Sequence, residues 1–307
     1  MKALGLDIGG TRVKCGIVDE RGRILELRDA PTPLRHDEFR AAVSSLITGL
    51  VSDDLAGAGI GAKGLINSET TRVESLPGTL NFLEGTLLSE LIPPPLRVAA
   101  DNDARAAMAA ELTWGAAKGC RNALMLTLGT GVGGAVVADG KLLGGANGAA
   151  GHVGHLTMDP RGPVCICGNH GCLETLFSAR AIESEAIAAV RRGCASVLTQ
   201  RFSTRPDALQ CHDVFEAAAA GDPLALLIRA RAIEMLGAAI AGLVHVLDPE
   251  VVILGGQISE AGAALFEPLA EEVRWRTRTM IQRAPPLAPP QVADRSGVAG
   301  AAALIFR

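Results

Sequence analysis

A glycine-rich turn between two apolar runs occurs twice in the chain, and this repetition constrains the fold more than any other feature of the sequence. The first copy reads Gly10-Thr11-Arg12-Val13, and the second reads Gly129-Thr130-Gly131-Val132. Each turn follows a strand-like run and leads into a second one, which is the pattern of a β-hairpin. Two similar hairpins predict two similar domains, each of which opens with a glycine turn.

The composition agrees with a folded chain of this kind and excludes several classes of protein. A chain of 307 residues with 48% hydrophobic and 20% charged residues can bury a sizeable core, which excludes intrinsic disorder. The net charge of −4 argues against a nucleic-acid partner, whose phosphates require a basic surface. Seven Phe, two Trp and no Tyr leave few rings on which bases could stack.

Helical periodicity fills the regions between the apolar runs, so we expect an α/β fold. Helices are expected over residues 37–51, 103–114, 223–247, 260–275 and 298–306, the fourth kinked or restarted at Pro268. We expect an N-terminal lobe at residues 1–117 and a C-terminal lobe at residues 118–291. A C-terminal helix within residues 292–307 is expected to return to the first lobe.

The N-terminal residues and the distribution of cysteines predict a cytoplasmic location. Asp7 interrupts the only run that could act as a secretory signal, and no run is long and apolar enough to span a membrane. Three of the seven cysteines lie within eight residues, while the other four are scattered. This distribution favours a metal site in a reducing compartment over a disulfide framework.

The first glycine turn, Asp7-Ile8-Gly9-Gly10-Thr11, is a candidate phosphate site. Glycine lets backbone N–H groups approach a ligand closely, and such turns cradle phosphates. The carboxylate of Asp7 and the hydroxyl of Thr11 suit Mg²⁺. An ordinary glycine hairpin is the alternative for this turn taken alone.

The second turn strengthens the case for a nucleotide site. Gly129, Thr130, Gly131 and Gly133 supply the second turn, and Gly255-Gly256 forms a further strand-to-helix turn whose helix N-terminus favours negative charge. We therefore expect a composite nucleotide site between two lobes. Neither turn has the Gly-Lys-Ser/Thr ending of a Walker-type phosphate loop.

Asp101-Asn102-Asp103 lies at a strand-to-helix junction and can be interpreted in two ways. These residue types are good helix N-caps. A carboxylate at this place can also accept a proton from a substrate hydroxyl during phosphoryl transfer, and Asp103 is our candidate for that base.

The most specific motif is His155 followed by Cys165, Cys167 and Cys172, four ligands that suit tetrahedral Zn²⁺. His170 could replace His155, and a group of buried thiols without metal is the remaining alternative. A site filled by four protein ligands is structural, so the ion would stabilise the loop over residues 155–174 and orient Glu174 at its end.

These motifs together resemble the ROK family of repressors, open reading frames and sugar kinases. The residues that carry the resemblance, in chain order, are Asp7-Ile8-Gly9-Gly10-Thr11, Asn102-Asp103, 129–134, Gly154-His155 and 165–174. The resemblance implies an actin-like ATPase (ribonuclease H-like) fold, a homodimer, and phosphorylation of a hexose or N-acetylhexosamine by ATP, usually at the 6-hydroxyl.

The resemblance also implies roles for single residues. Asp103 matches the catalytic base, Asn102, Gly64 and Glu174 match sugar contacts, and His155 matches both a zinc ligand and a sugar contact. The chain departs from the family at His152, where sugar kinases generally have Glu, and at Lys63, where they have Pro. A carboxylate only accepts hydrogen bonds, whereas neutral imidazole also donates one, so sugar specificity does not carry over directly.

An ATP-dependent sugar kinase, glucokinase-like, is thus the leading hypothesis. The alternatives are a sugar-sensing regulator and a non-catalytic sugar-binding protein of the same family. A regulator would carry a DNA-binding module ahead of the first turn, which here begins at residue 7. The presence of Asp7, Thr11 and Asp103 argues against a non-catalytic protein.

Overall fold

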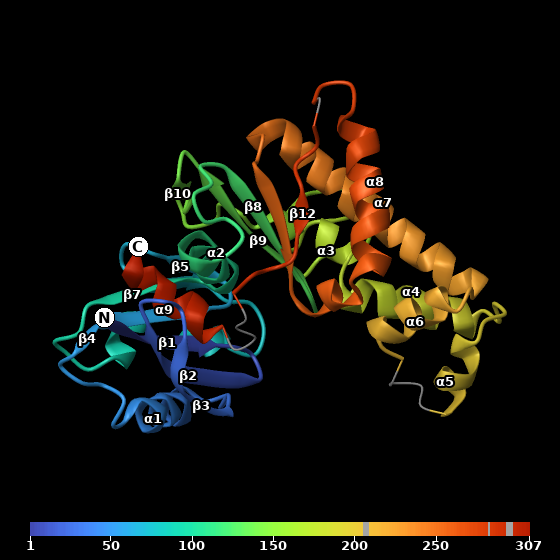
Figure 1. Ribbon diagram of the computed structural model, residues 1–307. Coiled ribbons are helices and arrows are strands. Elements are labelled where there is room, and N and C mark those ends of the chain that lie inside the picture. The colour runs from blue at the N-terminus through green and yellow to red at the C-terminus, as the bar shows by residue number, and fades with distance from the viewer. Residues whose placement is uncertain (205–208, 282, 293–296) are drawn as a thin grey trace. The chain divides into compact units, whose positions relative to one another are not determined.

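The computed structural model describes residues 1–204, 209–281, 283–292 and 297–307 (Figure 1). The chain forms two compact units. Unit 1 comprises Met1–Arg121, Ala135–Gly151 and Pro290–Arg307, and unit 2 comprises Asn122–Gly134 and His152–Pro289. Part of the expected returning segment, residues 293–296, lies outside the described residues.

The first sheet has the strand order β3-β2-β1-β4-β7. Its strands are β1 (Lys2–Ile8), β2 (Arg12–Asp19), β3 (Ile24–Pro31), β4 (Leu55–Ala62) and β7 (Val98–Asn102). The first three form an antiparallel meander, whereas β4 and β7 run parallel to β1. The carboxyl ends of the three parallel strands therefore meet at one edge, where Asp7 pairs with Gly61 and Ala62 pairs with Asn102.

Helices cover this sheet. They are α1 (His36–Ile47), α2 (Asp103–Trp114) and α9 (Val298–Phe306), and the other elements within residues 1–121 are β5 (Leu65–Asn67), β6 (Arg72–Ser75), η1 (Asn81–Leu83) and η2 (Leu88–Leu91). The helix α9 packs on β1, β4 and α2. This packing depends on Gly59, where a Cβ would lie 1.8 Å from the carbonyl oxygen of Ala301. The small side chains thus allow a close contact between helix and sheet.

The second sheet repeats the first, with the order β10-β9-β8-β11-β12. Its strands are β8 (Ala123–Leu128), β9 (Val132–Ala138), β10 (Lys141–Leu142), β11 (Val251–Gly255) and β12 (Leu287–Ala288). The strands β10 and β9 pair in antiparallel fashion, and β11 runs parallel to both β8 and β12. The shared strand order confirms the internal repeat predicted from the two glycine turns.

Unit 2 contains most of the remaining helices, of which α7 is the longest described. They are η3 (Val153–His155), α3 (Leu173–Leu176), α4 (Ala179–Arg191), α5 (Leu198–Thr204), α6 (Cys211–Ala219), α7 (Pro223–Leu247), η4 (Gln257–Ala261) and α8 (Ala263–Thr277). The helix α7 begins at the N-cap Asp222, whose side chain accepts a hydrogen bond from Ala225 N, and it packs against α8 (Figure 1).

The helices expected over residues 103–114, 223–247 and 298–306 are confirmed, and two others differ from expectation. The first helix ends at Ile47, four residues before the predicted end. The helix α8 continues through Pro268, so the predicted restart there is wrong. The interruption lies at Gly262, whose φ of 57° separates η4 from α8, because a left-handed residue ends one helix before the next begins.

Within the described part of the chain, none of the helices combines the length and the apolar character that a membrane span requires.

Candidate functional site

The first glycine turn, between β1 and β2, is closed by its own backbone. Gly9 N donates to Arg12 O at 3.1 Å. Thr32, directly after β3, supports the turn: its Oγ1 donates to Gly9 O and its N donates to Thr11 O. Gly10 and Thr11 remain exposed. The turn is therefore a rigid loop with an accessible tip, as a phosphate site requires.

The carboxylate of Asp7 lies at the N-terminus of α9, a contact that sequence reasoning missed. Gly297 is the N-cap of this helix, with φ 78°. A Cβ at position 297 would lie 2.6 Å from Asp7 Cγ. The positive end of the helix dipole thus faces the carboxylate. Asp7 and Thr11 offer oxygen atoms, the ligand type that Mg²⁺ prefers, so this donor set fits magnesium.

Asn102 joins the junction between β7 and α2 to the loop that follows β4. Its Oδ1 accepts a hydrogen bond from Ala104 N at 3.0 Å, which caps α2, and its Nδ2 donates to Gly64 O at 2.9 Å. The capping interpretation of this cluster therefore holds for Asn102. The same contacts bring together Gly64, Asn102 and Asp103, three of the predicted site residues.

Asp103 is the exposed residue of the cluster, and its carboxylate accepts a hydrogen bond from Ala104 N at 2.9 Å. Although the side chain reaches solvent, the dense protein surroundings raise the pKa of its carboxyl above the ordinary value. The N–H of Ala104 and the positive charge of Lys63 oppose this shift. A carboxyl with a raised pKa is a stronger base, which suits the acceptance of a proton from a hydroxyl.

Arg105 is a buried structural residue whose contacts sequence reasoning missed. It is fully buried and forms an ion pair with Asp101, one turn earlier in the chain. Its guanidinium also donates to the carbonyl oxygens of Ile66, at 3.1 Å, of Gly148, and of Ala150, at 3.3 Å. Arg105 therefore holds α2 to two distant segments of unit 1. The opposite charges of Asp101 and Arg105, four residues apart, were the one available signal in the sequence.

The second glycine turn, between β8 and β9, lies in unit 2. Gly129 N donates to Gly131 O at 3.0 Å, and Thr130 is exposed at the tip, while Gly133 follows in β9. Gly256 lies beside the same turn, because a Cβ at this position would lie 2.5 Å from Leu128 O. The structure thus brings Gly255 and Gly256 next to the residues 129–133.

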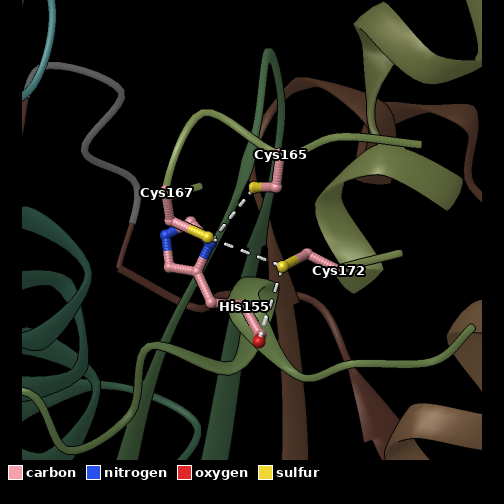
Figure 2. Close-up of side chains that lie close together, drawn as sticks. All are labelled: His155, Cys165, Cys167 and Cys172. Carbon is pink, nitrogen blue, oxygen red and sulfur yellow. Dashed lines mark hydrogen bonds between the residues drawn. The ribbon is translucent and has the colours of Figure 1, made fainter. Parts of the chain in front are cut away.

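The candidate metal ligands converge, as Figure 2 shows. One ligand atom from each of His155, Cys165, Cys167 and Cys172 lies within 4.8 Å of all the others. The sulfur of Cys165 is 3.6 Å from His155 Nδ1, and the sulfurs of Cys167 and Cys172 are 3.7 Å apart. Tetrahedral Zn²⁺ with bonds of about 2.3 Å would separate two sulfurs by about 3.8 Å, so the cluster fits this ion.

The surroundings of the cluster shift the pKa values of its thiols in opposite directions. Burial raises the pKa of the Cys172 thiol to about 12, and the backbone N–H of Asn169 lowers the pKa of Cys167. A bound cation would stabilise all three thiolates. His170 lies outside the cluster and is exposed, with Nδ1 3.4 Å from Gly162 O.

His152 lies beside the cluster. Its ring stacks on that of His155, with centroids 6.4 Å apart and planes 16° apart. Glu174, two residues after Cys172, accepts a hydrogen bond from Val132 N at 3.0 Å. The predicted residues of unit 2 therefore form one connected group of the glycine turn, Glu174, the two histidines and the cysteines.

Comparisons with known proteins agree with this arrangement. The ROK family profile matches residues 3–307. A glucokinase from Thermotoga maritima is 35% identical over 310 residues, which cover 99% of this chain and 97% of that protein. An N-acetylmannosamine kinase from Citrobacter koseri is 34% identical over 273 residues, which cover 87% of each.

Solved structures show the same fold. A ROK glucokinase from Streptomyces griseus in complex with glucose and AMPPNP has a TM-score of 0.83 and 31% identity, with 99% of each chain covered. A ROK hexokinase from Thermus thermophilus has a TM-score of 0.81 and 33% identity, with 100% of this chain and 98% of that chain covered. The fold is therefore the actin-like ATPase fold of ROK sugar kinases, and the chain belongs to the ROK family.

Proposed function

We propose that this protein is an ATP-dependent sugar kinase. It transfers the γ-phosphoryl group of ATP to the 6-hydroxyl of a hexose or hexose derivative. Glucokinases at 33–37% identity over most of the chain support this activity. The observation that carries the proposal is the exposed carboxylate of Asp103, which has a raised pKa and follows directly after Asn102 at the carboxyl end of β7.

Asp103 accepts the proton of the attacking hydroxyl in this proposal. Because its surroundings raise its pKa, the carboxylate gains more from protonation than an ordinary Asp. Asn102 orients the sugar next to it, and the carbonyl of Gly64, to which Asn102 is bonded, fixes the side chain of Asn102. Asp103 is thus held by α2, while Asn102 is held by the loop after β4.

The glycine turns bind ATP. The exposed residues Gly10, Thr11 and Thr130 present backbone N–H groups to the phosphates together with Gly131 and Gly133, and Gly255-Gly256 completes the site. Gly9 and Gly129 shape the two turns, because their own N–H groups close them. Asp7 and Thr11 would hold Mg²⁺, which neutralises charge on the phosphates when it is bound. Turn geometry therefore positions the nucleotide without a Walker lysine.

His152, His155 and Glu174 complete the sugar site. The stacked imidazoles offer hydrogen-bond donors and acceptors, whereas Glu174 offers only acceptors. Since His152 replaces the Glu of the family, we expect the preferred sugar to differ from glucose at a hydroxyl that His152 contacts. Zn²⁺ bound by His155 and the three cysteines would have a structural role, because the four protein ligands leave no open position.

The protein is further proposed to form a homodimer, as the family resemblance implies, and to act in the cytoplasm, as the N-terminal residues and the distribution of cysteines indicate. A sugar-sensing regulator remains the second candidate, since a ROK transcriptional regulator also has a TM-score of 0.86 with this chain. Asp103 with its raised pKa favours the enzyme, because a sensor needs no base.

A coupled assay of ADP release tests the activity. Wild-type protein is supplied with ATP, Mg²⁺ and a panel of aldohexoses, ketohexoses and aminosugars, and the phosphorylated carbon is identified by NMR. Sugar-dependent ADP release is expected with at least one hexose, and none with any sugar would refute the proposal. The variant His152→Glu is expected to shift the preference towards glucose or N-acetylmannosamine.

A further inference from the structure

The segment that carries the metal ligands touches the second glycine turn from two sides, and all of these contacts lie within unit 2. Gly154, which precedes His155, lies against Val132: a Cβ at position 154 would lie 2.0 Å from Val132 O. Glu174, which follows Cys172 by two residues, accepts a hydrogen bond from Val132 N at 3.0 Å. The segment therefore contacts both the carbonyl and the N–H of Val132.

The contact with Glu174 extends along the turn. A Cβ at Gly131 would lie 2.1 Å from Glu174 Oε2, so the carboxylate occupies the space in which a side chain at position 131 would lie. Ala179, at the start of α4, donates its N–H to Gly129 O at 2.8 Å. Three residues of the turn thus depend on the chain that follows Cys172.

The metal ligands in turn fix this chain. Cys172 and Leu173 are fully buried, and Leu173 N donates to Leu156 O at 2.8 Å, next to His155. The ligand atoms of His155 and Cys172 lie within 4.8 Å of each other. A metal ion bound there would hold Gly154 and Glu174 at a fixed separation, and Val132 lies between them.

We propose that Glu174 is a positioning residue for the nucleotide turn, through which the metal cluster sets the affinity for nucleotide as well as the shape of the sugar site. One oxygen of the carboxylate, Oε2, holds Val132 N. The other remains for a sugar hydroxyl, so a single carboxylate contacts the turn and, under the proposed function, the sugar. Loss of the metal loosens the turn because Glu174 is no longer held against it.

Hydrogen exchange and nucleotide binding test this inference on the full chain. Amide exchange over residues 129–134 is compared for wild type, Glu174→Ala, Glu174→Gln and wild type treated with a zinc chelator. Titration calorimetry then measures the dissociation constant of ADP with Mg²⁺ for the same four samples. Glu183→Ala is the matched control, because its carboxylate also accepts a backbone N–H, that of Cys211 at 3.0 Å, within the same unit.

Exchange over residues 129–134 is expected to be at least about tenfold faster in Glu174→Ala and in the chelated protein. The affinity for ADP is expected to fall about tenfold, which corresponds to about 1.4 kcal/mol. Glu174→Gln retains an acceptor oxygen and is expected to stay within about threefold of wild type. Chelation should add little in Glu174→Ala, since both changes break the same connection.

Unchanged exchange and unchanged ADP affinity in Glu174→Ala, or equal effects in Glu183→Ala, would overturn the inference. Should Glu174→Ala not fold, the chelated wild type still decides the inference, because unchanged exchange and unchanged ADP affinity after removal of the metal would overturn it. The exchange measurement needs neither nucleotide nor sugar. If wild type shows no sugar-dependent ADP release but exchange over residues 129–134 is faster in Glu174→Ala and in the chelated protein, the proposed kinase activity is refuted. The connection between the metal cluster and the glycine turn would still stand.

Discussion

The carboxylate of Asp7 lies against Gly297, so that a Cβ at position 297 would lie 2.6 Å from Asp7 Cγ. The two residues are far apart in sequence, yet they place the carboxyl end of β1 at the N-terminus of α9. The helix dipole stabilises the ionised carboxylate there. The candidate Mg²⁺ ligand is thus oriented by a helix at the other end of the chain.

Gly297→Ala is expected to displace Asp7 and to raise the Mg²⁺ concentration needed for half-maximal activity about tenfold. A left-handed Ala also costs about 1 to 2 kcal/mol of stability. Gly262→Ala is the matched control, because Gly262 is the N-cap of α8 with φ 57° and a Cβ at this position would lie 4.0 Å from Glu260 O, without a close contact. Equal Mg²⁺ dependence in both variants would argue against a role for Asp7 in binding the ion.

Arg105→Met is expected to lower the free energy of unfolding by about 3 to 5 kcal/mol, because it leaves the buried carboxylate of Asp101 without its partner. The double variant Asp101→Asn, Arg105→Met is expected to be less destabilised than the single one. Urea unfolding of the three proteins and of wild type measures this coupling. Additive effects would show that the pair does not act as a unit.

Lys63→Met is expected to move the acidic limb of the pH profile of kcat/KM to higher pH. The positive charge of Lys63 lowers the pKa of Asp103, so its removal raises this pKa further. The base must be deprotonated to act, and activity is therefore lost at a higher pH than in wild type. Lys118→Met, at an exposed lysine after α2, is the control and is expected to leave the profile in place.

Metal analysis of the purified protein is expected to find about one zinc per chain, as a closed site with four ligands predicts. Cys167→Ser is expected to reduce the zinc content, whereas Cys194→Ser changes an exposed cysteine outside the cluster and should not. Wild-type protein that is folded but contains almost no metal would refute the zinc assignment.

Local signals in the sequence were sufficient to predict the internal repeat and the helices over residues 103–114, 223–247 and 298–306. The helix α7 has an N-cap Asp followed by Pro at its first turn, and α2 has the capping residue Asn102, so their boundaries could be predicted. The spacing of cysteines likewise predicted the cluster, because its ligands come from one segment of chain.

Contacts between distant segments could not be predicted in this way. Arg105 donates to carbonyl oxygens of residues that lie about 40 positions away on either side, and no local pattern encodes which carbonyls a buried guanidinium meets. The same holds for Gly297 beside Asp7 and for Glu174 beside Gly131, since glycine leaves no side chain that would mark the contact.

The role of Asp103 as the base is the central claim, and the turnover of Asp103→Asn tests it most directly. The variant keeps the shape of the side chain but cannot accept the proton, so kcat is expected to fall at least about a thousandfold while ADP and sugar bind as in wild type. Asp37→Asn, at an exposed residue of α1, is the control with unchanged kcat. An Asp103→Asn enzyme that retains a tenth or more of the wild-type kcat would contradict this account.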